Sequence, residues 1–153
     1  MNYSFLRKIG YLRGFYKGHL GNTESGSMIY SAEPKIAQVV QDIKLEFVYL
    51  LGQATIVMLY SIWEGFVFEI QNNDSQRYNL HFKKSYEEYY NNQVKEVSLI
   101  RNCIAHNRGI IDKQYTSQSL AQTYKLGDEI KLIEQNIDVY FGAVEQAFGD
   151  ITK

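Results

Sequence analysis

The sequence predicts an all-α protein, a single domain over residues 1–153 built as a bundle of about four to five helices. Three observations predict this class. The chain contains one proline, so long helices can run without interruption. Apolar residues recur three or four positions apart along several long segments, which is the spacing of one helical face. With 153 residues, 45% of them apolar, the chain is long enough to bury a real core.

Residues 3–18 form the first predicted helix. Its apolar residues share one helical face: Phe5, Ile9, Leu12 and Tyr16. The neighbouring face carries glycine at every fourth position: Gly10, Gly14 and Gly18. Such a face either allows close approach of another helix or weakens the helix until a partner orders it. Residues 20–30 are expected to be a flexible loop, so residues 1–30 form an N-terminal helix and loop within the domain.

The longest predicted helix starts near Ser31 and Pro34, a cap and a first-turn proline, and runs to the polar residues after Ile70. Its apolar positions follow helical steps: Ile36, Val39, Val40, Ile43, Phe47, Leu50, Leu51, Ala54, Val57, Met58, Ile62, Phe66 and Ile70. Trp63 is expected in the core, and Glu64 is expected to be either solvated or the partner of a basic group. Gln53, Glu64 and Glu69 interrupt the apolar run, which favours a buried bundle helix over a membrane span.

The second half of the chain contains two further helices and a small appendage. Ser85 to Glu88 reads as a capping box that opens a helix running toward Gly109. Residues 110–123 are expected to be a loop, or a loop with a short helical turn. Gly127 and Asp128 predict a hairpin turn between residues 124–126 and 129–132. A last helix over residues 134–148 would stop at Gly149 and turn one apolar face inward: Ile137, Tyr140, Phe141, Val144 and Phe148.

The segment with the most useful chemistry runs from Arg101 to Asn107, at the end of a helix. Arg101 can clamp a phosphate by two hydrogen bonds, His106 can move a proton near neutral pH, and Asn102 can orient either group. Five residues of helix separate the Arg and the His by about 140° around the axis. Use of both on one ligand therefore requires either a break near Ile104 or a second copy of the motif.

Charge and cysteine content narrow the classes of function. The net charge of −1 argues against a protein that coats nucleic acid without specificity. Four basic residues precede the first acidic one, Glu24, and form either a phosphate-binding arm or a solvated helical face: Arg7, Lys8, Arg13 and Lys17. The single cysteine, Cys103, excludes an intrachain disulfide and favours a reducing, cytoplasmic location. Cys103 and His106 are spaced like half a metal site, but no further ligand pair accompanies them, so neither metal nor cofactor is expected.

The motif and its context resemble the HEPN superfamily of small helical proteins. Arg101, Asn102 and His106 match that family's signature of an Arg, a polar residue and a His after four to six intervening residues. A long preceding helix with Trp63 and Glu64 also looks like the family, as do residues 106–112 and 124–130, and the resemblance covers about residues 36–148. It implies a metal-independent endoribonuclease that acts as a homodimer with a composite site, leaving a cyclic phosphate and a 5′-hydroxyl.

The resemblance also implies a context and a set of roles. Arg101, Asn102 and His106 would be catalytic, and Asn107 and Arg108 would bind the RNA substrate. The chain would be a cytoplasmic toxin or antiviral-defence effector, with RNA, a second copy and a cognate antitoxin protein as partners and no membrane. Some HEPN toxins are controlled by modification of a tyrosine two residues after the motif His. Arg108 occupies that position here, so this form of control is not expected.

Two alternatives remain open at this level. The chain could be a non-catalytic HEPN-like module for dimerisation or for binding a nucleotide or RNA. Arg101 and His106 could also be ordinary helix-end residues, because a cation near a helix C-terminus stabilises it by about 0.3–1 kcal/mol.

Overall fold

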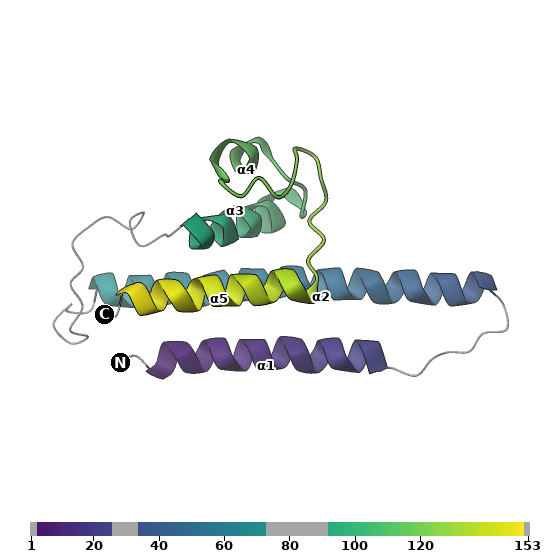
Figure 1. Ribbon diagram of the computed structural model, residues 1–153, viewed down its shortest axis with the longest axis horizontal. Coiled ribbons are helices and arrows are strands. Elements are labelled where there is room, and N and C mark those ends of the chain that lie inside the picture. The colour runs from purple at the N-terminus through teal and green to yellow at the C-terminus, as the bar shows by residue number, and fades with distance from the viewer. Residues whose placement is uncertain (1–2, 26–33, 73–91, 152–153) are drawn as a thin grey trace.

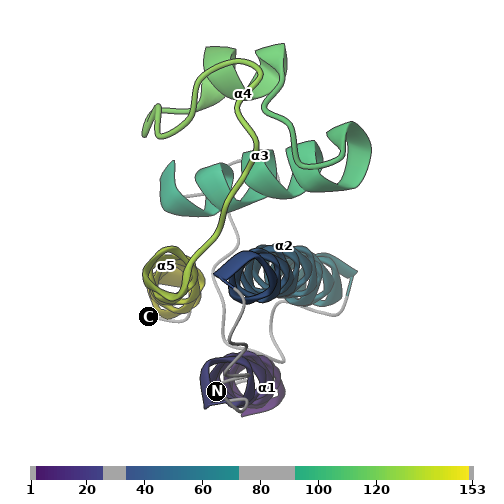
Figure 2. The same cartoon turned by 90° about the vertical axis from the view of Figure 1, so that its right-hand side faces the viewer.

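The computed structural model describes residues 3–25, 34–72 and 92–151, and these residues form five helices and no strand, which confirms the all-α class. The helices are α1 (Tyr3–Ser25), α2 (Pro34–Asn72), α3 (Asn92–Asn107), α4 (Lys113–Gln118) and α5 (Glu134–Ile151). Helices α1, α2 and α5 lie side by side with their axes roughly aligned (Figure 1). Viewed along those axes, α3 crosses α2 and α5 on the side away from α1, and α4 lies outermost (Figure 2).

The inward face of α1 is the one that the sequence predicted. Phe5, Ile9, Leu12 and Tyr16 are all buried, and Leu20 extends the same face. Helix α1 continues to Ser25, so the loop predicted from residue 20 is wrong for residues 20–25. The remainder of that predicted loop lies outside the described residues.

The glycines of α1 do not serve close packing. Gly10, Gly14 and Gly18 are exposed, and a Cβ atom built on each would meet nothing within 4 Å. Close approach is found instead at Gly52 of α2, where an added Cβ would lie 2.9 Å from both the Cβ and the carbonyl oxygen of Leu132. The segment leading into α5 can therefore cross α2 only because residue 52 has no side chain.

Helix α2 has the predicted bounds but presents two different apolar faces. Trp63 is fully buried, as predicted, and meets Phe5 of α1 edge-on, with 6.1 Å between ring centroids. Phe5 in turn stacks on Phe148 of α5 at 4.6 Å. The remaining residues of the buried face are Ile56, Leu59, Tyr60, Phe66 and Val67. Of the ten predicted apolar positions whose burial the structure describes, six are exposed: Val39, Ile43, Phe47, Leu50, Ala54 and Met58.

The first turns of α2 extend past the ends of both α1 and α5 (Figure 1). By length and composition alone, residues Gln41–Glu69 are apolar enough to cross a membrane, with a mean hydropathy of 1.5 and 28% of that window buried. The expectation of a buried bundle helix thus describes the second half of α2, where the core residues lie, and not the first half.

The predicted hairpin around Gly127 is wrong. The turn itself is present, since the amide of Asp128 donates to the carbonyl of Lys125 and Gly127 has a φ of +86°. The residues after the turn pair with the segment that follows α3 instead of folding back on residues 124–126: Ile110 and Glu129 form an antiparallel bridge, and Ile130 N–H donates to the carbonyl of Gly109. The short helical turn expected within residues 110–123 is α4, capped by Asp112, whose side chain accepts from Tyr115 N–H. The predicted capping box at Ser85 lies outside the described residues.

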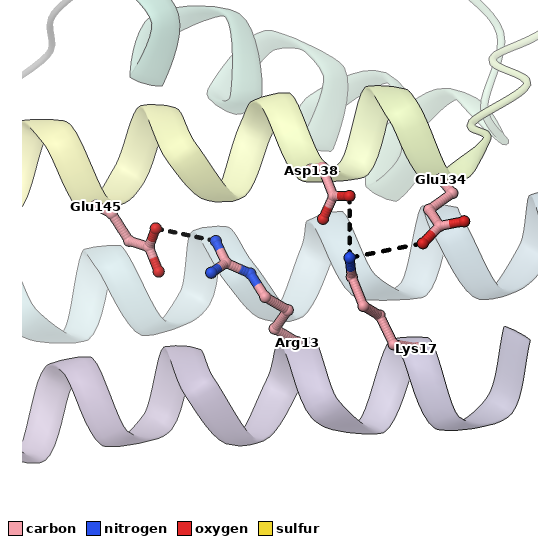
Figure 3. Close-up of polar contacts among 5 residues, drawn as sticks. All are labelled: Arg13, Lys17, Glu134, Asp138 and Glu145. Carbon is pink, nitrogen blue, oxygen red and sulfur yellow. Dashed lines mark hydrogen bonds and ion pairs between the residues drawn. The ribbon is translucent and has the colours of Figure 1, made fainter. Parts of the chain in front are cut away.

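Helix α5 packs the predicted inward face, since Ile137, Tyr140, Phe141, Val144 and Phe148 are buried, but it runs past Gly149 to Ile151. Two cations of α1 meet its acidic side (Figure 3). Arg13 contacts Glu145 at 2.9 Å, and Lys17 lies 3.1 Å from Asp138 and 3.6 Å from Glu134. These two residues therefore tie α1 to α5, and only Arg7 and Lys8 of the basic segment remain exposed without an ion pair among the described residues.

Candidate functional site

The motif lies on a helix that does not break. Helix α3 is continuous from Asn92 to Asn107, and the chain turns only at Arg108 and Gly109, with φ values of +56° and +76°. The amide of Gly109 donates to the carbonyl of Cys103 at 3.0 Å and closes the helix end. A Cβ at position 109 would lie 2.9 Å from Nε2 at the flexible end of the Gln53 side chain, so glycine is favoured here mainly by the positive φ.

Arg101 makes three contacts, two with α2 and one with its neighbour on α3. Its guanidinium lies over the Tyr60 ring, with 5.3 Å between Cζ and the ring centroid, and one of its nitrogens is 3.7 Å from a carboxylate oxygen of Glu64. A second nitrogen donates to Asn102 Oδ1 at 2.9 Å. The Arg101 side chain is 26% exposed, and its buried Nε has no hydrogen-bond partner among the described residues. Glu64 is thus the partner of a basic group, but with its side chain 38% exposed it is not a buried partner. Asn102 orients Arg101.

His106, Asn107 and Arg108 are exposed at the end of α3. Neither the His106 ring nor the Arg108 guanidinium contacts a polar group in the part of the chain that the structure describes. Asn107 donates from Nδ2 to the carbonyl of Ile110 at 2.7 Å, so its side chain supports the turn. His106 and Arg108 are therefore available to a ligand, whereas Asn107 is engaged.

Within one chain, the structure does not bring Arg101 and His106 together. Because α3 remains helical between them, they project about 140° apart. Arg101 faces α2, while His106 faces solvent. Of the two conditions under which both groups could act on one phosphate, a break near Ile104 is absent, which leaves a second copy of the motif.

No metal centre is formed by the residues that the structure describes. Among them, no group of three or more His, Cys, Asp or Glu side chains is placed to hold an ion. Cys103 is fully buried, and desolvation raises the pKa of its thiol, so it is an inert core residue and not half of a metal site.

A buried carboxylate on α3 was missed by sequence reasoning. Glu96 is 6% exposed and accepts hydrogen bonds from the hydroxyls of Tyr115, at 2.5 Å, and Ser119, at 2.6 Å. It is buried because α4 and the segment after it cover the side of α3 remote from α2. No periodicity in the sequence signals that cover, since α4 has only six residues.

Comparison with protein-family models, with curated proteins and with solved structures found no match to this chain.

Proposed function

We propose that this chain is a metal-independent endoribonuclease of HEPN type, acting as a homodimer in which Arg101 and His106 of both copies form one site. A toxin or antiviral-defence effector in the cytoplasm, restrained by a cognate antitoxin, is the corresponding role. The observation that carries the proposal is the arrangement at the end of α3. There Asn102, Glu64 and Tyr60 hold Arg101 in place, and His106 stands exposed without a partner among the described residues.

The chemistry of RNA cleavage explains why two copies are needed. Attack by a 2′-hydroxyl on its own phosphate requires a base for that hydroxyl, an acid for the leaving oxygen and positive charge at the phosphate. One chain provides a single motif imidazole, and in an in-line displacement the attacking and leaving oxygens lie on opposite sides of the phosphorus, so one imidazole cannot reach both. Two chains related by a two-fold axis supply two imidazoles and two guanidiniums, and the reaction is then complete without a metal.

The exposed face of α2 supports this assembly. Six large apolar residues on α2 are exposed at helical steps, and we call them the α2 stripe: Val39, Ile43, Phe47, Leu50, Met58 and Phe68. Ser61 and Gly65, which are small and exposed, continue the same face and flank Glu64, the partner of Arg101. A second copy packed on this stripe would bury its apolar surface and approach closely where side chains are small. That contact would lie next to Arg101.

Single-turnover cleavage of a labelled single-stranded RNA tests the proposal. His106→Ala is expected to reduce the rate by about 10²–10⁴-fold, because it removes a proton-transfer group. Arg101→Ala is expected to lower it strongly by removing the phosphate clamp, and Asn102→Ala less, because the amide only orients. His19→Ala is the matched control: this histidine is also exposed, lies on α1 and should not affect cleavage.

Two further measurements distinguish the mechanism from other sources of activity. Cleavage by the wild type is expected to survive excess EDTA. If EDTA abolished cleavage and added magnesium restored it, the proposed mechanism would be contradicted. A mixed dimer of His106→Ala and Arg101→Ala chains retains one copy of each group, and its rate would show whether the two act across the interface. A His106→Ala protein that folds and cleaves like the wild type would refute the assignment.

A non-catalytic role is the second candidate, and one observation favours it. Glu64 partly offsets the charge of Arg101, which suits a structural ion pair as well as a poised phosphate clamp. Under this alternative, the protein binds RNA or a nucleotide without cleaving it, and binding is lost in Arg101→Ala but retained in His106→Ala.

A further inference from the structure

A pocket of about 450 Å³ lies between α3, α5 and the segment after α4, away from the motif. Its walls are mostly apolar, with Leu120 and Ala121 on one side and Val139 and Ala143 on the other. The Tyr140 ring and the Glu96 side chain also line it, and both are buried. The volume is in the range that holds a small organic ligand.

Each carboxylate oxygen of Glu96 accepts one hydrogen bond from a hydroxyl. Ser119 Oγ accepts from Gln122 N–H at 3.0 Å, so the hydroxyl proton of Ser119 is directed to Glu96 Oε2. Tyr115 donates to the other carboxylate oxygen, Oε1, at 2.5 Å. Each oxygen thus accepts one neutral donor, and the carboxylate keeps a free lone pair on each.

The charge of Glu96 is not balanced within the described part of the chain. No Lys, Arg or His of residues 3–25, 34–72 or 92–151 lies within ion-pair distance of it. A buried carboxylate is costly unless a cation compensates it, and hydroxyl donors do not supply a positive charge. Burial also raises the pKa of the Tyr140 phenol, so the neighbouring ring stays neutral and presents its π face or hydroxyl as a dipole.

We propose that this pocket binds an organic cation, a guanidinium on a short alkyl chain, with Glu96 as its counter-ion. The two free lone pairs, one on each oxygen, match the forked N–H donors of a guanidinium better than the point charge of an ammonium. The alkyl chain would lie along Val139, Ala143 and Leu120, and the Tyr140 ring would contribute a cation–π contact. A free alkylguanidine and the arginine side chain of another protein share this chemistry.

The proposal is tested by titrating the full chain with n-butylguanidinium and, separately, with n-butylurea, its neutral isostere. Backbone amide NMR shifts at Ala121, Val139 and Ala143 report binding without any need for RNA cleavage. We expect saturable shifts with n-butylguanidinium at millimolar concentration and at least tenfold weaker binding of n-butylurea. Equal binding of the two compounds, or shifts with neither, would overturn the proposal.

Variants test whether binding depends on the pocket itself or on the stability of the whole fold. Glu96→Gln keeps the shape, removes the charge and is expected to abolish the preference for n-butylguanidinium. Glu46→Gln, at an exposed carboxylate on α2, should leave it unchanged. Should Glu96→Gln lower stability through Tyr115 and Ser119, Val139→Trp is the second test, because it narrows the mouth of the pocket from an exposed position. Unchanged binding in a folded Glu96→Gln or Val139→Trp protein contradicts the site.

A blocked peptide, acetyl-Gly-Arg-Gly-amide, distinguishes the two sources of the cation. Binding at least as tight as that of n-butylguanidinium would indicate an arginine of a protein partner, and weaker binding would indicate a free small molecule. This site contains neither Arg101 nor His106, so its outcome is independent of the proposed ribonuclease activity.

Discussion

The two apolar faces of α2 have similar composition and very different surroundings. One face packs against α1, α3 and α5 and includes Trp63 at 0% exposure. The other, the α2 stripe, includes Leu50 at 62% exposure, and its residues also share one helical face. In Figure 1, the first turns of α2 project beyond the helices that cover the rest of it.

This contrast shows what periodicity measures. A regular apolar stripe indicates that a face is apolar, and burial then depends on which other helices are long enough to reach it. Helix α1 has 23 residues and α5 has 18, so neither can cover all 39 residues of α2. The remaining apolar residues share one helical face over several turns of α2, and this is the surface that the proposed second copy would cover.

The largest effect is expected when the packed face is broken. Trp63→Ala should reduce the free energy of unfolding by about 3–5 kcal/mol, because it empties a fully buried site of its largest side chain. Leu50→Ala, on the stripe, removes an exposed side chain and should have little effect on the isolated monomer. Urea denaturation followed by far-UV circular dichroism at low protein concentration measures both, since Trp63 is the only tryptophan and fluorescence is lost with it. A comparable loss in the two variants would show that the stripe is part of the monomer core.

Where a helix has a single dominant apolar face, the sequence was sufficient to predict which of its residues are buried. The inward residues of α1 and α5 were predicted correctly because polar residues and glycines fill most of the rest of each helix, although Tyr11, Phe15 and Val139 are exposed. In α2 both faces are apolar, so the pattern could not say which one the bundle would cover. The pairing of residues 109–111 with 127–130 could not be predicted either, because it depends on where the end of α3 lies relative to a turn about 20 residues later.

The same limit applies to the candidate site. Glu64 could be named as a partner for a basic group, since it lies within a strongly apolar helix. The sequence could not show that this basic group is Arg101, which lies over the Tyr60 ring. The pairing depends on how α2 and α3 cross. Glu96 was not recognised at all, because the residues that bury it come from α4 and the segment after it.

The next effect, of intermediate size, concerns the stripe. Leu50→Lys should weaken self-association at least tenfold, about 1.4 kcal/mol, by placing a charge on the surface that the second copy would cover. Leu126→Lys is the matched control, because Leu126 has a similar exposure, 57% against 62%, and does not lie on α2. Sedimentation velocity over a range of concentrations measures both. A wild type that stays monomeric at micromolar concentration, or equal dissociation by both variants, would remove the support that the stripe gives to the dimer.

The smallest effect is expected at the rim of the packed face, where Lys17 of α1 bridges Asp138 and Glu134 of α5 (Figure 3). The hydrogen bond with Asp138 raises the pKa of Lys17, so the stabilisation is fully present below the ordinary lysine pKa and is lost as pH rises through the raised value. Lys17 is solvent-exposed, and such pairs contribute little and are screened by salt. Lys17→Met should therefore lower stability slightly at low salt and neutral pH, and the difference should disappear at about 1 M salt. Lys8→Met is the control, an exposed cation of α1 without an ion pair among the described residues. If the loss of stability in Lys17→Met persisted at high salt, Lys17 would stabilise the protein through the packing of its methylene chain between α1 and α5. The contact would then be apolar and not an ion pair.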